Sequence, residues 1–163
     1  MTMTHILQII LFGALTILLV LKIDMSRVSR AERLARDKFV RLVRAVDSVV
    51  AGEQFPETAG LLYKSRVMLE NAHTFPEKIA AARFFLGAVE TFDLPPEQIE
   101  NLKKLAFSAI GTFHRAHTAK MMFRKRWHLP GTQYVRISEE QVAAARKRLL
   151  TNFYRDYVKF NPE

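Results

Sequence analysis

The chain has no cysteine among its 163 residues, which excludes a disulfide framework, a thiolate metal site and a cysteine nucleophile. Glycine and proline number only six each, too few for a collagen-like chain. The glycines are isolated from one another, so the sequence contains no glycine-rich phosphate loop. It also contains no Gly-x-Ser-x-Gly nucleophile motif. We therefore expect a protein that is not an enzyme, has no cofactor and takes no small-molecule substrate.

A long uncharged stretch near the start of the chain decides the protein class. The residues from Ile6 to Leu21 include twelve Ile, Leu, Val or Phe side chains and no charged one. At the centre of a membrane helix such side chains contribute about −0.3 to −0.6 kcal/mol each, so together they favour insertion by about 4 to 7 kcal/mol. Residues 1–25 are therefore predicted to form a transmembrane anchor. The anchor side chains expected to lie in lipid are Ile6, Ile9, Ile10, Phe12, Leu15, Leu18, Leu19 and Leu21.

Two other interpretations of this stretch are weaker. A cleaved signal peptide would carry positive charge before its apolar core and small residues at a cleavage site. Here the apolar core is preceded by Met1–His5, which has no Lys or Arg, and ends in Lys22, Ile23 and Asp24. A buried helix of a soluble protein would usually be shorter and flanked by capping residues. We favour the uncleaved, single-pass anchor.

Basic residues lie on one side of this stretch. No Lys or Arg precedes it, whereas Lys22, Arg27, Arg30 and Arg33 come soon after it. Because an excess of Lys and Arg stays on the cytoplasmic side, we expect the N-terminus outside and the C-terminal domain in the cytoplasm. These four juxtamembrane residues are also expected to meet anionic lipid head groups.

Residues 26–163 are predicted to form a small basic bundle of about five helices, so the fold class is all-α. Apolar residues recur at helical spacing from Val28 to Val50, with arginines on the opposite face. Proline followed by glutamate at 56–57, 76–77 and 96–97 indicates helix starts, because proline suits the first turn and glutamate the positive end of the dipole. The predicted helices span 26–51, 56–73, 75–92, 96–128 and 138–160. The core residues expected from the first two are Val28, Ala35, Phe39, Leu42, Val46, Val49, Leu61, Leu62, Met68, Leu69 and Ala72.

The even spacing of these helix starts, about 20 residues, is also typical of helical-repeat scaffolds. Fewer than two full helix pairs are present, however, and the helix interiors do not match. We therefore favour an ordinary bundle.

His114 and His117 are the only weak candidates for a metal site. They lie three residues apart on a predicted helix, close enough to share an ion. No third ligand is evident in the sequence, and His117 falls on the apolar stripe, where a hydrogen-bonded core histidine is the simpler interpretation. We expect no metal site.

The segment from Lys120 to His128 combines basic and aromatic side chains and is the best candidate for a contact surface. The residues proposed for it are Lys120, Arg124, Lys125, Arg126 and Trp127. They could meet lipid phosphates, another protein or a nucleic acid backbone. In the alternative interpretation, the cations simply balance the helix dipole and the aromatic residues fill the core.

The net charge of +9 favours anionic partners. We expect a membrane-anchored interaction protein, an accessory subunit or adaptor of a larger membrane-associated complex, whose partners are an anionic bilayer and one or more protein subunits. The alternative is a membrane-tethered nucleic-acid-binding protein, since residues 114–163 carry 11 basic and 4 acidic side chains. No helix-turn-helix, RNP-type or zinc-binding pattern supports base reading, which makes this alternative the weaker one.

Overall fold

The computed structural model describes residues 3–52, 56–130 and 137–160, and within them the fold consists of helices without any strand. The elements are α1 (Met3–Gly52), α2 (Pro56–Glu70), α3 (Phe75–Ala88), the 3-10 turn η1 (Val89–Thr91), α4 (Pro96–Arg126) and α5 (Glu139–Phe160). The predicted all-α class is confirmed.

The main difference from the predicted elements is at the start of the chain. The anchor and the first amphipathic helix form one uninterrupted helix, α1, of 50 residues. At 1.5 Å per residue α1 is roughly 75 Å long. The sequence between the two parts contains no proline or glycine, so nothing interrupts the backbone hydrogen bonds. The apolar stretch and the bundle are therefore joined rigidly.

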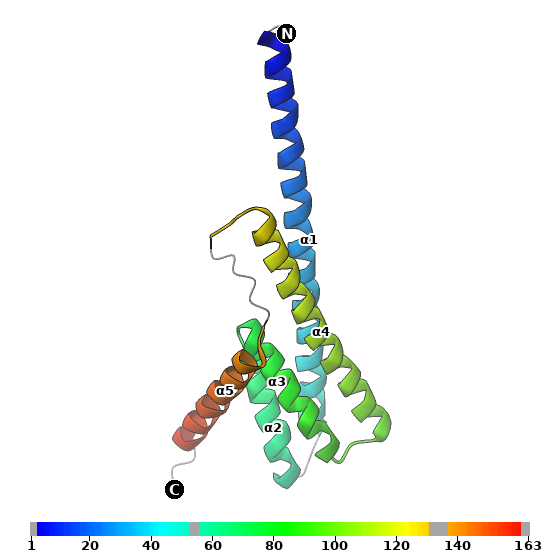
Figure 1. Cartoon of the computed structure of the whole chain (residues 1–163). Coiled ribbons are helices and arrows are strands. Elements are labelled where there is room, and N and C mark those ends of the chain that lie inside the picture. The colour runs from blue at the N-terminus through cyan, green and yellow to red at the C-terminus, as the bar shows by residue number, and fades with distance from the viewer. Residues whose placement is uncertain (1–2, 53–55, 131–136, 161–163) are drawn as a thin grey trace.

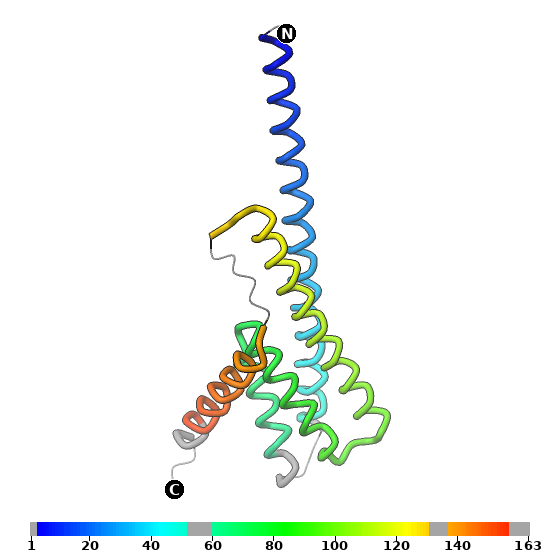
Figure 2. Tube along the Cα trace, viewed as in Figure 1, coloured from blue at the N-terminus to red at the C-terminus, as the bar shows by residue number. Residues whose placement is uncertain are grey.

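Successive helices run in alternating directions, as in an up-and-down bundle (Figures 1 and 2). α4 packs along the C-terminal half of α1, and α3 packs against both α4 and α5. The apolar stretch at the start of α1 stands clear of every other described helix, and the start of α1 and the end of α5 lie at opposite ends of the molecule (Figure 1).

One hydrophobic core joins all five α-helices. The middle of the stripe predicted on α1 is confirmed, since Ala35, Phe39, Leu42 and Val46 are buried. Val28 and Val49, at the two ends of the stripe, are half-buried. At the centre, the ring of Phe113 on α4 lies 5.5 Å from that of Phe39 and 5.5 Å from that of Phe75 on α3. The other core side chains from α2 to α5 include Leu62, Met68, Leu69, Ile79, Phe85, Leu102, Ala106, Val142, Ala145 and Leu149. The prediction for Leu61 was wrong: its side chain is 44% exposed, because Leu62 and Ser65 occupy the inner face of α2.

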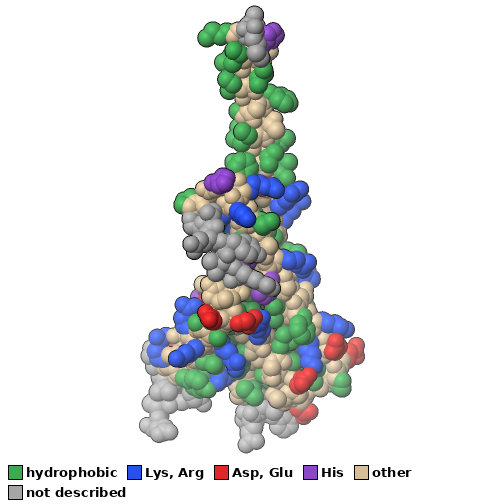
Figure 3. Space-filling model, viewed as in Figure 1, with side chains coloured by type: hydrophobic (Ala, Val, Ile, Leu, Met, Phe, Trp, Pro, Cys, Tyr) green, Lys and Arg blue, Asp and Glu red, His purple; other side chains and the backbone are tan. Residues whose placement is uncertain are grey.

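The N-terminal half of α1 is long and apolar enough to cross a membrane. None of its most apolar 18-residue window is buried in the fold. Figure 3 shows hydrophobic side chains covering this part of the helix, with Lys and Arg side chains gathered where the bundle begins. In water such a surface would be unfavourable, because a monomeric soluble protein rarely exposes so large a continuous apolar area.

Glu77 connects the start of α3 to α5. Its carboxylate accepts hydrogen bonds from the backbone amides of His73 and Thr74, while the Thr74 hydroxyl accepts one from the Glu77 amide, which completes a capping box. Arg148 of α5 lies 2.9 Å from the same carboxylate. Burial acts to raise the pKa of Glu77, but the backbone hydrogen bonds and Arg148 outweigh it and hold the pKa below its ordinary value of 4.5.

A lowered pKa means that the Glu77 carboxylate stabilises the fold above pH 4.5, and that this contribution is lost as the pH falls through the pKa of the folded protein. We expect Glu77→Ala to lower the free energy of unfolding by about 1 to 2 kcal/mol at neutral pH. Glu77→Gln should lower the free energy of unfolding by a smaller amount. The difference in this free energy between the wild type and Glu77→Gln should shrink below pH 4.5. Urea titrations across pH would measure both effects.

Glu97→Gln is the matched control, because it removes the same charge from an exposed first-turn position of α4. An equal loss of stability in this variant would show that the capping geometry of Glu77 is not the cause.

Candidate functional site

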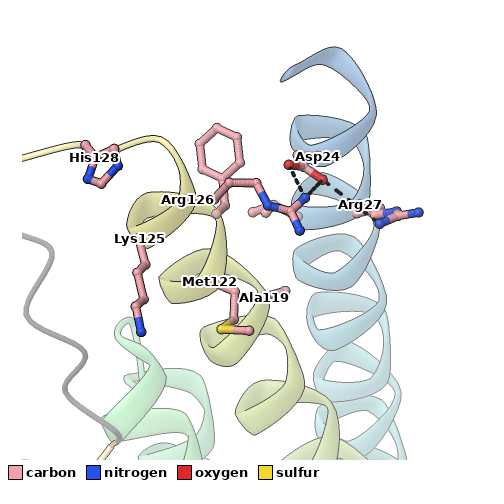
Figure 4. A pocket seen from close by; sticks show the side chains of 9 residues that line it. Asp24, Arg27, Ala119, Met122, Lys125, Arg126 and His128 are labelled. Carbon is pink, nitrogen blue, oxygen red and sulfur yellow. Dashed lines mark hydrogen bonds and ion pairs between the residues drawn. The ribbon is translucent and has the colours of Figure 1, made fainter. Parts of the chain in front are cut away.

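The end of α4 meets α1 at the point where the apolar stretch of α1 ends. Asp24 lies there, and its side chain is covered by the last turn of α4, so that the residue is only 7% exposed. Figure 4 shows Arg126 reaching across from α4 to Asp24, with Arg27 approaching from α1 itself. A carboxylate that is buried at a helix–helix contact needs cationic partners, and this one has them.

The Asp24 carboxylate is held by donors from both helices. The Nη1 atom of Arg126 lies 3.0 Å and 2.8 Å from its two oxygens. The Nε1 atom of Trp127 donates to the second of these oxygens at 3.3 Å. Arg27 adds an ion pair at 4.0 Å. These charge-assisted hydrogen bonds attach the end of α4 to α1.

The turn after α4 explains how Trp127 reaches α1. His128 adopts a left-handed conformation, with φ at 47°. The amide of Leu129 donates to the carbonyl of Arg124 at 3.1 Å, and that of His128 to the carbonyl of Lys125 at 3.4 Å. This pattern is a Schellman motif, which usually has glycine at the left-handed position. The helix was predicted to end at residue 128 before Pro130, and it ends two residues earlier for this reason.

A pocket of about 520 Å³ opens between α1 and the α4 tip, meaning the segment Met122–His128. Its apolar lining is Val28, Ala119, Met122 and Phe123, and its charged or polar lining is Asp24, Arg27, Lys125, Arg126 and His128. Arg27 and Arg126 are both well exposed at its edge. Figure 4 shows Arg126 turned toward α1, while Lys125 and His128 lie on the other side of the α4 tip.

The structure brings together residues that the sequence alone assigned to two separate surfaces. Arg27, from the juxtamembrane group, and Arg126, from the contact segment, meet at Asp24. Lys22, Arg30 and Arg33 lie exposed on α1. The tertiary structure therefore brings positively charged side chains of α1 and α4 together where the apolar stretch of α1 ends.

Some of the contact segment has internal partners. Lys120 pairs with Glu32 of α1 at 3.1 Å, and Arg126 and Trp127 hold Asp24. Arg124 and Lys125 make no ion pair with an acidic side chain in the described part of the chain. Lys120, Arg126 and Trp127 therefore each have a partner on α1.

His114 and His117 lie half-buried on α4, and the His117 ring packs edge-on against Phe75 with centroids 6.5 Å apart. Among residues 3–52, 56–130 and 137–160, no three His, Cys, Asp or Glu side chains are grouped closely enough to hold a metal ion.

Asp24 was not predicted as a site residue. One signal was present in the sequence: Asp24 is the first acidic residue of the chain, and it comes directly after the apolar stretch in a region otherwise rich in Arg and Lys. Comparisons with protein families, curated proteins and solved structures give no significant match to this chain. The function of this protein must therefore be inferred from its own geometry.

Removing the Arg126 side chain should release the end of α4 from α1. We expect Arg126→Ala to speed backbone hydrogen exchange over residues 122–128 by about five- to tenfold, because the local opening no longer breaks the paired hydrogen bonds to Asp24. Lys125→Ala is the matched control, since this neighbouring exposed cation does not touch Asp24. Similar exchange rates in both variants would rule out a specific attachment through Asp24.

Proposed function

We propose that this protein is a single-pass, membrane-anchored helical adaptor, which holds its bundle at the membrane surface and docks there onto a larger protein assembly. The N-terminal half of α1 spans the bilayer. The N-terminus faces outside and the bundle faces the cytoplasm.

The observation that carries the proposal is the division of α1 into two surfaces. The N-terminal half exposes Leu, Ile and Phe side chains on all sides, while the C-terminal half buries one stripe and exposes arginines. The first surface is suited to lipid and the second to a protein core with water around it. Because both belong to one helix, the anchor directly sets the position of the bundle relative to the membrane.

The distribution of charge supports the orientation. Lys22, Arg27, Arg30 and Arg33 come soon after the apolar stretch, and the end of α4 returns to the same level with Arg124, Lys125 and Arg126. The cationic side of the proposed span is thus reinforced by residues about 100 positions further along the chain.

An exposed aromatic residue supports docking onto another protein. Phe107 on α4 is 63% exposed, whereas Phe113 on the same helix is almost fully buried. Tyr63 on α2 and Tyr154 on α5 are also about half exposed. Large aromatic side chains of this kind are enriched at protein interfaces.

Two measurements test the proposal. Protease added outside sealed cells should leave the C-terminal bundle intact, and digestion of the bundle would contradict the orientation.

Extraction in mild detergent should yield an assembly larger than the monomer. Phe107→Glu should reduce the size of this assembly, while Lys104→Glu on the same helix should not. A monodisperse monomer would contradict the adaptor role, and salt-sensitive retention on DNA would favour the nucleic-acid alternative.

A further inference from the structure

We propose that the pocket between α1 and the α4 tip binds the head group of an anionic phospholipid. This inference rests on the proposed membrane span, and it identifies which lipid chemistry the anchored domain recognises and where. Arg27 and Arg126 bind the phosphate, and the apolar side of the pocket contacts the upper part of the lipid.

The position of the pocket along α1 agrees with the position of a lipid head group. Asp24 and Arg27 lie three and six residues beyond Leu21, the last residue of the apolar stretch. At 1.5 Å per residue they stand roughly 5 and 9 Å beyond it along the helix axis. The polar layer on each side of a bilayer is of that order of thickness, roughly 5 to 8 Å. The pocket therefore opens into the layer that contains the lipid phosphates.

The charge balance of the pocket favours an anion. Arg27 and Arg126 line it together with the single carboxylate of Asp24, while the Lys125 side chain is directed away from α1 (Figure 4). Asp24 offsets one of the two guanidinium charges, so a net positive charge remains beside Asp24. Arg126 uses its Nη1 atom for both bonds to Asp24, so these bonds do not use its Nη2 and Nε atoms. A guanidinium held in this way presents its second edge in a fixed orientation, as phosphate binding requires.

The apolar side of the pocket distinguishes a lipid from free phosphate. Val28, Met122 and Phe123 line it beside the charged groups, and Met122 is largely exposed. Free phosphate gains nothing from such a surface, whereas the glycerol and upper acyl chains of a phospholipid do. The indole nitrogen of Trp127 donates a hydrogen bond to Asp24, which places Trp127 beside the pocket. Tryptophan is enriched in membrane proteins at the interface between lipid and water.

The test uses the full-length chain in nanodiscs of phosphatidylcholine, alone or mixed with phosphatidylglycerol, with lipids that remain bound after release counted by native mass spectrometry. We expect one phosphatidylglycerol molecule to be retained per chain. Arg27→Gln should weaken its retention by about fivefold, in line with the contribution of one basic residue near an anionic surface. The Arg27 side chain is exposed, so this substitution leaves the core intact.

Arg30→Gln is the matched control, because it removes the same charge from α1 near the pocket without altering the pocket lining. Equal losses in the two variants would overturn the proposal in favour of diffuse surface charge. Retention of phosphatidylcholine as strongly as phosphatidylglycerol would also overturn it, as would release of the lipid by inorganic phosphate in detergent. Failure of the chain to enter nanodiscs would instead refute the membrane span itself.

Discussion

Leu15→Arg combined with Leu18→Arg should leave most of the chain outside the membrane fraction. Near the middle of the apolar stretch each leucine favours insertion into the membrane, whereas an arginine opposes insertion by about 2.5 to 3.5 kcal/mol. The double change therefore makes the free energy of insertion less favourable by about 6 to 8 kcal/mol. The twelve apolar side chains of the entire stretch favour insertion by only about 4 to 7 kcal/mol. The fraction of protein that stays with membranes after an alkaline wash measures the effect.

The same helix provides a matched control. Leu34 and Val40 are exposed apolar residues of α1 that lie in the bundle half, with 47% and 39% of their surface accessible. Arginine at these two positions should leave membrane association unchanged, because both side chains face water under the proposed arrangement. If both double variants remained in the membrane fraction, or if both left it, the division of α1 into a lipid half and a water half would be wrong.

Phe113→Ala should lower the free energy of unfolding by about 3 to 5 kcal/mol, the usual cost of removing a large aromatic side chain from a core. Phe113 is 1% exposed and packs against Phe39 of α1 and Phe75 of α3, while the Lys78 ammonium lies 5.7 Å from its ring. Its loss therefore leaves a cavity where three helices meet. Urea unfolding of the detergent-solubilised chain, monitored by far-ultraviolet circular dichroism, measures the change.

Phe107→Ala is the control for this experiment, since it makes the same substitution on the same helix at an exposed position. We expect it to change the free energy of unfolding by no more than about 0.5 kcal/mol. Similar losses at both positions would mean that the burial of Phe113 in the core does not set the effect of its removal.

The helices were largely predictable because their signals are local. Proline and glutamate near the start of α3 and of α4, and the apolar stripe from Ala35 to Val46, depend on neighbours within a few turns of the same helix. The helix ends were less predictable. α3 gives way at Ala88 to a 3-10 turn, although this helix was predicted to extend to residue 92. The left-handed turn after α4 is made by His128, a residue type with only a modest preference for it.

The candidate site was predictable only in part. Arg27 and Arg126 were both identified as basic residues for contact, but for separate surfaces. Asp24 was marked only by being the first acidic residue after the apolar stretch, and its partners could not be predicted because they lie more than 100 positions away. Helical periodicity places a residue on one face of its helix, but it does not determine which residue of another helix that face meets.

The amino-acid sequence by itself determined the helical class, the apolar surface of the N-terminal half of α1 and the basic character of the residues after it, because these depend on composition and short-range spacing. Only the tertiary structure decided that the end of α4 returns to α1 at Asp24. That contact depends on the lengths and alternating directions of the intervening helices, which together set where α4 ends along α1.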